Sequence, residues 1–250
     1  MIRTKVLKTN LGKDAGFRWR GTEVSRIEGF SDNVFGFALT LLVVSLEVPK
    51  TFSDLQETIQ GSIGFALAFG LLFIFWHEHY KYFRRYGLED NTVIWINAAL
   101  LFVILFFVYP LKFLFFYLVK AFSGLSRNVQ LPDGSFVPAI ENYQWSTLMT
   151  VYGCAFVMIY VIFILLYLHA YRKKAELELN EVELLITKNS IIGCSVNCLI
   201  GIISITIVTS GGFQYAGISG LMYAFIGPVQ TVLGYYNRKK INQLKKSFEI

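Results

Sequence analysis

The sequence predicts an all-α integral membrane protein, a single domain over residues 1–250 that folds into a bundle of six transmembrane helices per subunit. Of its 250 residues, 54% are hydrophobic and only 16% are charged. A soluble domain with this composition would aggregate. Six apolar runs also reach roughly the 20 residues that an α-helix needs to cross the hydrocarbon core. These spans are 29–48, 57–83, 91–119, 144–171, 183–209 and 214–236.

The lysines and arginines predict the orientation of the helices, because cytoplasmic loops of membrane proteins collect basic residues. Most of the 23 Lys and Arg lie in the N-terminal arm, in the turns after the second and fourth spans, and in the C-terminal tail. Six crossings with both termini cytoplasmic bring all four segments to the inner side of the cell membrane. The net charge of +6 then follows from topology, and no nucleic-acid partner is expected.

The first span opens with charged residues at the bilayer boundary. The stretch Arg26-Ile-Glu-Gly-Phe30-Ser31-Asp32 leads into a run from Asn33 to Val48 whose only charge is Glu47. Ionisable groups in such positions commonly mark ion or proton pathways. An ordinary flank, in which long side chains reach from the helix end to the headgroups, is the alternative.

A helical phase of about 100° per residue gives this first span one distinctive stripe. Relative to Phe37, Asp32 lies about 140° away and Glu47 about 80° away. Within about 60° of Phe37 lie Asn33, Thr40, Leu41, Val44 and Val48. The stripe is therefore mostly apolar, with a polar Thr40 near its middle. Apolar side chains at this spacing usually belong to a bundle core, so both a core and a pore remain open at this point.

The stretch Trp76-His77-Glu78-His79 looks like a metal cluster but lacks the required spacing. Two histidines two positions apart point to different sides of a helix, unlike the pair four apart in zinc proteases. The sequence also lacks the Gly-x-Ser-x-Gly and His-Glu-x-x-His motifs of hydrolases. We therefore expect no metal site, no cofactor, no enzymatic activity and no small-molecule substrate.

The pattern Arg-x-x-x-Phe-Ser-Asp at the start of a first transmembrane helix resembles the motif of the transmembrane protein 175 family, potassium channels of endolysosomes and prokaryotes. Trp76-His77 in the second span, Asn97 in the third span and Tyr109-Pro110 also resemble the pattern of that family. The resemblance covers the first three spans. The last three match only in number and hydrophobic character.

The resemblance implies a potassium-permeable cation channel without a P-loop selectivity filter, whose pore is lined by the first helix. Carried over residue by residue, Phe37, Leu41 and Val44 form apolar constriction rings, and Thr40 contributes to selectivity for potassium in transit. These positions share the stripe found above from helical phase alone. Glu47, near the outer mouth, can concentrate cations there. A charge on the outer face of the helix, among the lipid headgroups, is the alternative for Glu47.

The resemblance also implies a network within each subunit that holds the first helix in place. Its members are Arg26, Phe30, Ser31, Asp32, Trp76, His77 and Asn97. Family members with one copy of the motif assemble as homotetramers. By this resemblance, the single copy here implies four chains around a pore in the lipid bilayer.

Two positions depart from the family pattern or from ideal geometry. The family usually has isoleucine or leucine where this chain has Phe37, and an aromatic ring there changes both the ring radius and the way in which the gate opens. Ideal phase places Arg26 near the stripe, where four arginines would repel cations. We expect the helix to begin irregularly around Gly29 and to turn Arg26 aside.

An alternative from another functional class is a proton-coupled secondary transporter that uses Asp32, Glu47 or His77. The absence of a paired repeat among the six predicted helices makes this alternative weaker.

Overall fold

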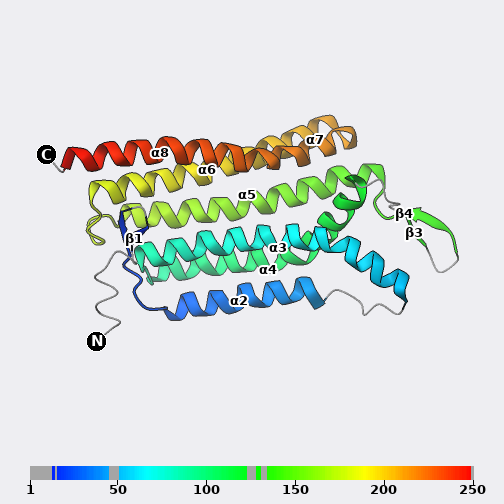
Figure 1. Cartoon of the computed structure of the whole chain (residues 1–250), viewed down its shortest axis with the longest axis horizontal. Coiled ribbons are helices and arrows are strands. Elements are labelled where there is room, and N and C mark those ends of the chain that lie inside the picture. The colour runs from blue at the N-terminus through cyan, green and yellow to red at the C-terminus, as the bar shows by residue number, and fades with distance from the viewer. Residues whose placement is uncertain (1–12, 15, 45–50, 123–127, 131–133, 249–250) are drawn as a thin grey trace.

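The chain folds into long, roughly parallel helices, as the computed structural model in Figure 1 shows for residues 13–14, 16–44, 51–122, 128–130 and 134–248. The helices are α2 (Arg26–Val44), α3 (Phe52–Tyr86), α4 (Asn91–Phe122), α5 (Asn142–Arg172), α6 (Glu181–Gly211), α7 (Ala216–Leu221) and α8 (Ile226–Phe248). Two short antiparallel ribbons join β1 (Lys13–Asp14) to β2 (Phe17–Arg18) and β3 (Asn128–Gln130) to β4 (Phe136–Pro138). The predicted all-α fold is confirmed, with these two ribbons added.

The helices follow one another across the bundle (Figure 1). α2 lies at one edge against α3 and α4, α5 and α6 follow, and α8 lies on α6 at the opposite edge. β1, the start of α2 and the described end of α8 lie at one end of the bundle, together with the α3–α4 and α5–α6 turns. We call this the arm end. The β3–β4 ribbon lies at the other end.

Five described helical stretches are long and apolar enough to cross a membrane. They are Ser62–Tyr86, Asn91–Tyr117, Asn142–Arg172, Glu181–Gly211 and Phe213–Lys245. Their outer faces carry large apolar side chains, such as the stacked rings of Phe102 and Phe106, each 70% exposed. Such surfaces fit a lipid environment. The stretch 45–50, which contains Glu47, lies outside the described residues, so the full length of the first predicted span is not seen.

The last predicted span, 214–236, is built from several pieces. α6 ends at Gly211 and is capped by Gly212, whose φ of 69° is favourable only for glycine. The 3₁₀ turns Phe213–Tyr215 and Met222–Phe225 flank α7, and α8 then begins at Ile226. Pro228 is the third residue of α8 and follows closely on the 3₁₀ turn Met222–Phe225. Its missing N–H thus coincides with the change from 3₁₀ to α geometry.

The segment that follows β2 ties the arm end together. The Arg20 guanidinium donates to both oxygens of Glu183 at 2.7 and 3.2 Å, and its Nε donates to the Leu177 carbonyl at 2.8 Å. Glu183 is buried, and its Oε1 also accepts from the Arg18 N–H at 2.8 Å. This ion pair fastens the arm to the first turn of α6.

Gly21 allows the same segment to lie directly on the end of α3. Its N–H donates to the Arg84 carbonyl at 3.2 Å. A Cβ at Gly21 would come within 2.5 Å of the Phe83 carbonyl oxygen, so only glycine permits this approach.

Asp90 fixes the start of α4 and joins it to the end of α5. Its Oδ1 accepts from the N–H groups of Thr92 and Val93 at 2.9 and 3.2 Å, as a helix cap. Its Oδ2 accepts from His169 Nε2 at 2.8 Å and lies 3.3 Å from Lys173 Nζ. The α3–α4 turn is thereby held against the end of α5.

These contacts predict how stability depends on pH. Burial alone would raise the pKa of Asp90, but hydrogen bonds from His169 and Val93 and the charge of His169 outweigh burial and lower the pKa to about 2. A lowered pKa in the folded state stabilises the fold above the ordinary value of about 3.9, and this stabilisation is lost as the pH falls toward 2. We expect Asp90→Asn to lower the free energy of unfolding at pH 7 and to matter progressively less between pH 4 and pH 2. Chemical denaturation of the wild type and of Asp90→Asn between pH 7 and pH 2 measures the two free energies of unfolding. A difference between them that stays constant with pH would contradict the lowered pKa of Asp90.

Candidate functional site

α2 has one face turned toward its own subunit. The buried residues recur every three or four positions, as expected for one side of a helix. They are Glu28, Ser31, Phe35, Ala38 and Leu42. The apolar members pack in the core with α3 and α4. α2 is therefore held along one side only.

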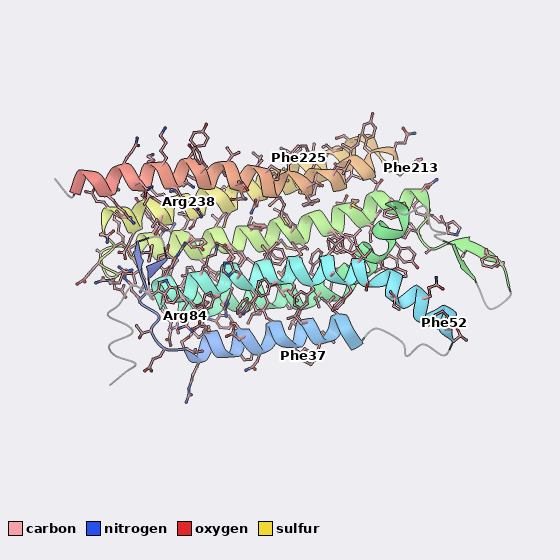
Figure 2. The ribbon with its side chains drawn as sticks, in the orientation of Figure 1. Phe37, Phe52, Arg84, Phe213, Phe225 and Arg238 are labelled. Atoms are coloured by element: carbon pink, nitrogen blue, oxygen red, sulfur yellow. The ribbon has the colours of Figure 1, made fainter. Side chains whose placement is uncertain are left out.

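The opposite face of α2 carries the stripe predicted from helical phase. Phe37 is 61% exposed, and Asn33 and Thr40 are exposed as well, whereas Leu41 is half-buried at the border of the core. Figure 2 shows Phe37 on α2 at the edge of the bundle. The interpretation of the stripe as core of a single subunit is thus wrong for Phe37 and Thr40. The side chain of Val44 and all of Glu47 lie outside what the structure describes.

Thr40 has a defined hydroxyl geometry. Its Oγ1 donates to the carbonyl oxygen of Phe37 at 2.7 Å. Because the hydroxyl proton is used inside the helix, the oxygen lone pairs are left on the exposed side. An exposed hydroxyl in this state is an acceptor and can contact a cation.

A buried chain of hydrogen bonds joins α2, α3 and α4 behind this face. Asn97 Nδ2 donates to Ser31 Oγ at 2.8 Å, and Asn97 Oδ1 lies 3.0 Å from His79 Nε2. Ser31 in turn donates to the Ile27 carbonyl at 2.8 Å. All three side chains are buried. Buried polar groups that satisfy one another in this way fix the relative positions of their helices.

The histidine that takes part in these buried hydrogen bonds is His79, whereas the resemblance to the family implied His77. His77 is exposed and stacks on Tyr80, with ring centroids 6.4 Å apart. His79 lies on the buried side of α3 with Phe75 and Phe83, four positions before and after it. The sequence signal that could have identified His79 is this apolar spacing. The two histidines do point to different sides of α3, as predicted.

Asp32 and Trp76 form a second link between α2 and α3. Trp76 Nε1 donates to Asp32 Oδ1 at 2.8 Å. Phe30 is exposed on α2 and takes no part in the buried chain. Arg26 is the first residue of α2 and is exposed. Among the described residues, it makes no hydrogen bond to the other members of the predicted network. The helix is regular through Gly29, whose N–H donates to Ser25 O at 2.9 Å, so the expected irregular start is wrong.

One ion pair at the start of α2 was not predicted. Glu28 Oε1 lies 3.3 Å from Arg84 Nη2, with Glu28 buried and Arg84 nearly so. Arg84 Nη1 also donates to the Gly21 carbonyl at 3.0 Å. Figure 2 places Arg84 near the arm end, beside the start of α2. The arm, α2 and α3 thus meet at one guanidinium.

Long apolar helices, an outer helix with one uncovered face and a buried polar anchor behind that face together define a helical-bundle membrane protein. The model of the TMEM175 family, described as endosomal/lysosomal potassium channel TMEM175, matches residues 26–107, which include α2 and its anchor. A protein of Marivirga tractuosa named potassium channel is 37% identical over 96% of this chain and 98% of its own length. This chain belongs to the TMEM175 family.

Two solved structures resemble the fold. The first is a crystal structure of a variant of the potassium channel MtTMEM175 in complex with a nanobody fusion protein. It is 35% identical, has a TM-score of 0.77, and the match covers 92% of this chain and all of that one. The second, a lysosomal potassium-selective channel TMEM175 homolog from Chamaesiphon minutus, is 22% identical with a TM-score of 0.52 and supports the fold alone.

Proposed function

We propose that this chain forms a potassium-permeable cation channel of the cell membrane, with a pore lined by α2. The observation that carries the proposal is the stripe of Phe37 and Thr40, which α2 turns away from its own subunit. The Marivirga relative, matched over almost its whole length, is named a potassium channel. No enzymatic activity and no cofactor beyond the permeant ion are proposed.

The assembly is a homotetramer in which four copies of α2 surround the axis. Four symmetry-related copies of this uncovered face, each with a polar residue in its middle, can enclose a water-filled path. Each subunit crosses the membrane six times, with both termini on the cytoplasmic side. The concentration of basic side chains at the arm end supports that orientation.

Conduction is controlled by apolar rings. Four copies of Phe37, with Leu41 and Val44 farther along the helix, narrow the path so that water and ions are excluded when the rings are close. Small outward movements of α2 admit water and then ions. Glu47, after the last ring, concentrates cations at the outer mouth.

Selectivity rests on Thr40, because the sequence lacks the Thr-Val-Gly-Tyr-Gly motif of P-loop filters. The hydroxyl oxygen faces outward with its proton bound to the Phe37 carbonyl, so four such oxygens can replace part of the hydration shell. Potassium loses its water more readily than sodium does, so a ring of this kind favours potassium. The chain Ser31–Asn97–His79 and the Asp32–Trp76 bond hold each α2 in register and do not touch the ion.

Flux measurements separate this channel from the proton-coupled transporter. Purified protein in liposomes with a potassium gradient should carry a passive flux that needs no proton gradient. A flux that is strictly coupled to pH would support the transporter, and absence of flux would overturn the proposal. A density map in which α2 does not surround a central axis would overturn it equally.

Thr40→Val tests the selectivity ring. Valine keeps the shape of threonine but removes the oxygen, so we expect the preference for potassium over sodium to fall while the total cation flux persists. Reversal potentials under mixed potassium and sodium gradients measure this preference. Ser195→Val is the matched control, since Ser195 is also an exposed hydroxyl that donates within its own helix, to the Ile191 carbonyl. An unchanged preference in Thr40→Val would remove Thr40 from the ion path.

A further inference from the structure

Two lysines at the arm end share one aromatic ring. Many basic side chains there are paired with a carboxylate. The described pairs include Arg20–Glu183, Arg84–Glu28, Lys81–Glu78 and Lys173–Asp90. Within the described part of the chain, no ion pair to a carboxylate is found for Lys174 or Lys188. Each instead places its ammonium over the ring of Tyr171, at 5.4 and 5.6 Å from the centroid.

The three residues come from two neighbouring helices. Tyr171 is in the last turn of α5, Lys174 follows in the α5–α6 turn, and Lys188 lies two turns into α6. α5 and α6 run side by side, joined at the arm end (Figure 1). Both lysines are exposed and Tyr171 is half-buried. We call this group the Tyr171 site.

The site lies where a membrane surface is expected. The apolar stretches on the two helices end at Arg172 and begin at Glu181. Tyrosine favours the headgroup level, because its ring is apolar and its hydroxyl is polar. Lysines within a turn or two of a span end reach that same level. A ligand held here would therefore lie among lipid headgroups.

The charges at the site call for an anion. Two ammonium groups at one ring repel each other, and the attraction of each to a half-buried ring is modest. A phosphate at this site would interact favourably with both lysines and could also accept a hydrogen bond from the Tyr171 hydroxyl. Glu181, the nearest acidic residue before Lys188 on the outer side of α6, instead lines a depression with Lys240 on α8.

We infer that the Tyr171 site binds the phosphate of an anionic phospholipid in the leaflet at the arm end. Free phosphate offers the same chemistry, but the position at a span boundary favours the lipid. The lipid bridges the end of α5 and the start of α6. Its binding therefore stabilises the folded protein in proportion to how tightly the headgroup is held.

The test compares the full-length protein with two double variants in detergent. Lys174→Gln with Lys188→Gln removes the site. Lys239→Gln with Lys240→Gln makes the same change of charge on exposed lysines of α8 at the same end. The proteins are titrated with phosphatidylglycerol, phosphatidylcholine or inorganic phosphate, and the unfolding temperature is measured at each concentration.

We expect phosphatidylglycerol to raise the unfolding temperature of the wild type and of the α8 variant, and phosphatidylcholine to have little effect. The site variant should bind phosphatidylglycerol about thirtyfold more weakly, the loss expected for two lysines at an anionic surface. Lys174→Arg with Lys188→Arg should keep most of the affinity. If both Gln variants lost the same affinity for phosphatidylglycerol, the effect would come from general surface charge. If inorganic phosphate raised the unfolding temperature as much as phosphatidylglycerol does, the ligand would be a free anion. Either result would overturn the proposal.

Discussion

Replacement of Phe37 by alanine is expected to raise potassium flux through the closed channel by about tenfold, which corresponds to a barrier lower by about 1.4 kcal/mol. Phe37 projects its ring from the exposed face of α2, so four copies form the bulkiest ring on the proposed axis. Alanine widens that ring and lets water enter the constriction. The rate at which a potassium-loaded liposome loses its gradient measures the change.

The control for this experiment is Phe102→Ala. Phe102 is an aromatic side chain of the same size, 70% exposed, but on α4. If it faces lipid, its truncation leaves the flux unchanged. Equal fluxes from wild-type protein and both variants would show that the exposed face of α2 does not line the ion path. An equal increase in both would show a general loss of bilayer integrity.

The largest loss of stability is expected for Arg20→Met. Methionine leaves the Glu183 carboxylate buried without its guanidinium, and removing one member of a buried ion pair typically costs about 3 kcal/mol. It also removes the donors to the carbonyls of Leu177 and Glu178. Chemical denaturation in detergent micelles measures the free energy of unfolding directly.

Arg18→Met is the matched control two positions away. Arg18 Nη2 lies 3.8 Å from a Glu178 oxygen, and both side chains are largely exposed, 59% and 81%. Water screens such a pair, so its loss should change the stability by about 1 kcal/mol or less. If the two variants lose the same amount, the burial of the Arg20–Glu183 pair is not what stabilises the arm.

The helices and the exposed stripe could be predicted because they depend on local patterns. An apolar run long enough to cross the bilayer indicates a helix wherever it occurs. A phase of about 100° per residue was enough to separate the stripe from the buried side of α2, which Ser31, Phe35 and Leu42 occupy. The hydrogen bond between Asn97 and Ser31 could be anticipated only from the family resemblance, since the two residues are in different helices.

The contacts that could not be predicted are pairs of residues far apart in the sequence. Nothing in the local sequence indicates that Glu28 meets Arg84 or that Arg20 meets Glu183. His79, by contrast, could have been chosen over His77 from its spacing of four residues to the buried Phe75 and Phe83. The 3₁₀ turn Met222–Phe225 before α8 escaped prediction because it lies within the continuous apolar run 214–236, in which hydropathy gives no sign of 3₁₀ geometry.

The clamp of Gly21, Glu28 and Arg84 has a mechanical consequence for α2. It holds α2 at the arm end, so a tilt of α2 about this point acts as the rotation of a lever. At about 1.5 Å of rise per residue, Phe37 lies about 14 Å and Leu41 about 20 Å along the axis from Glu28. Any given tilt therefore displaces Leu41 by a longer arc than Phe37. In the proposed channel, a helix hinged in this way moves its far end outward first, and the ring of Phe37, which has the shortest arm, is the last to leave the proposed axis.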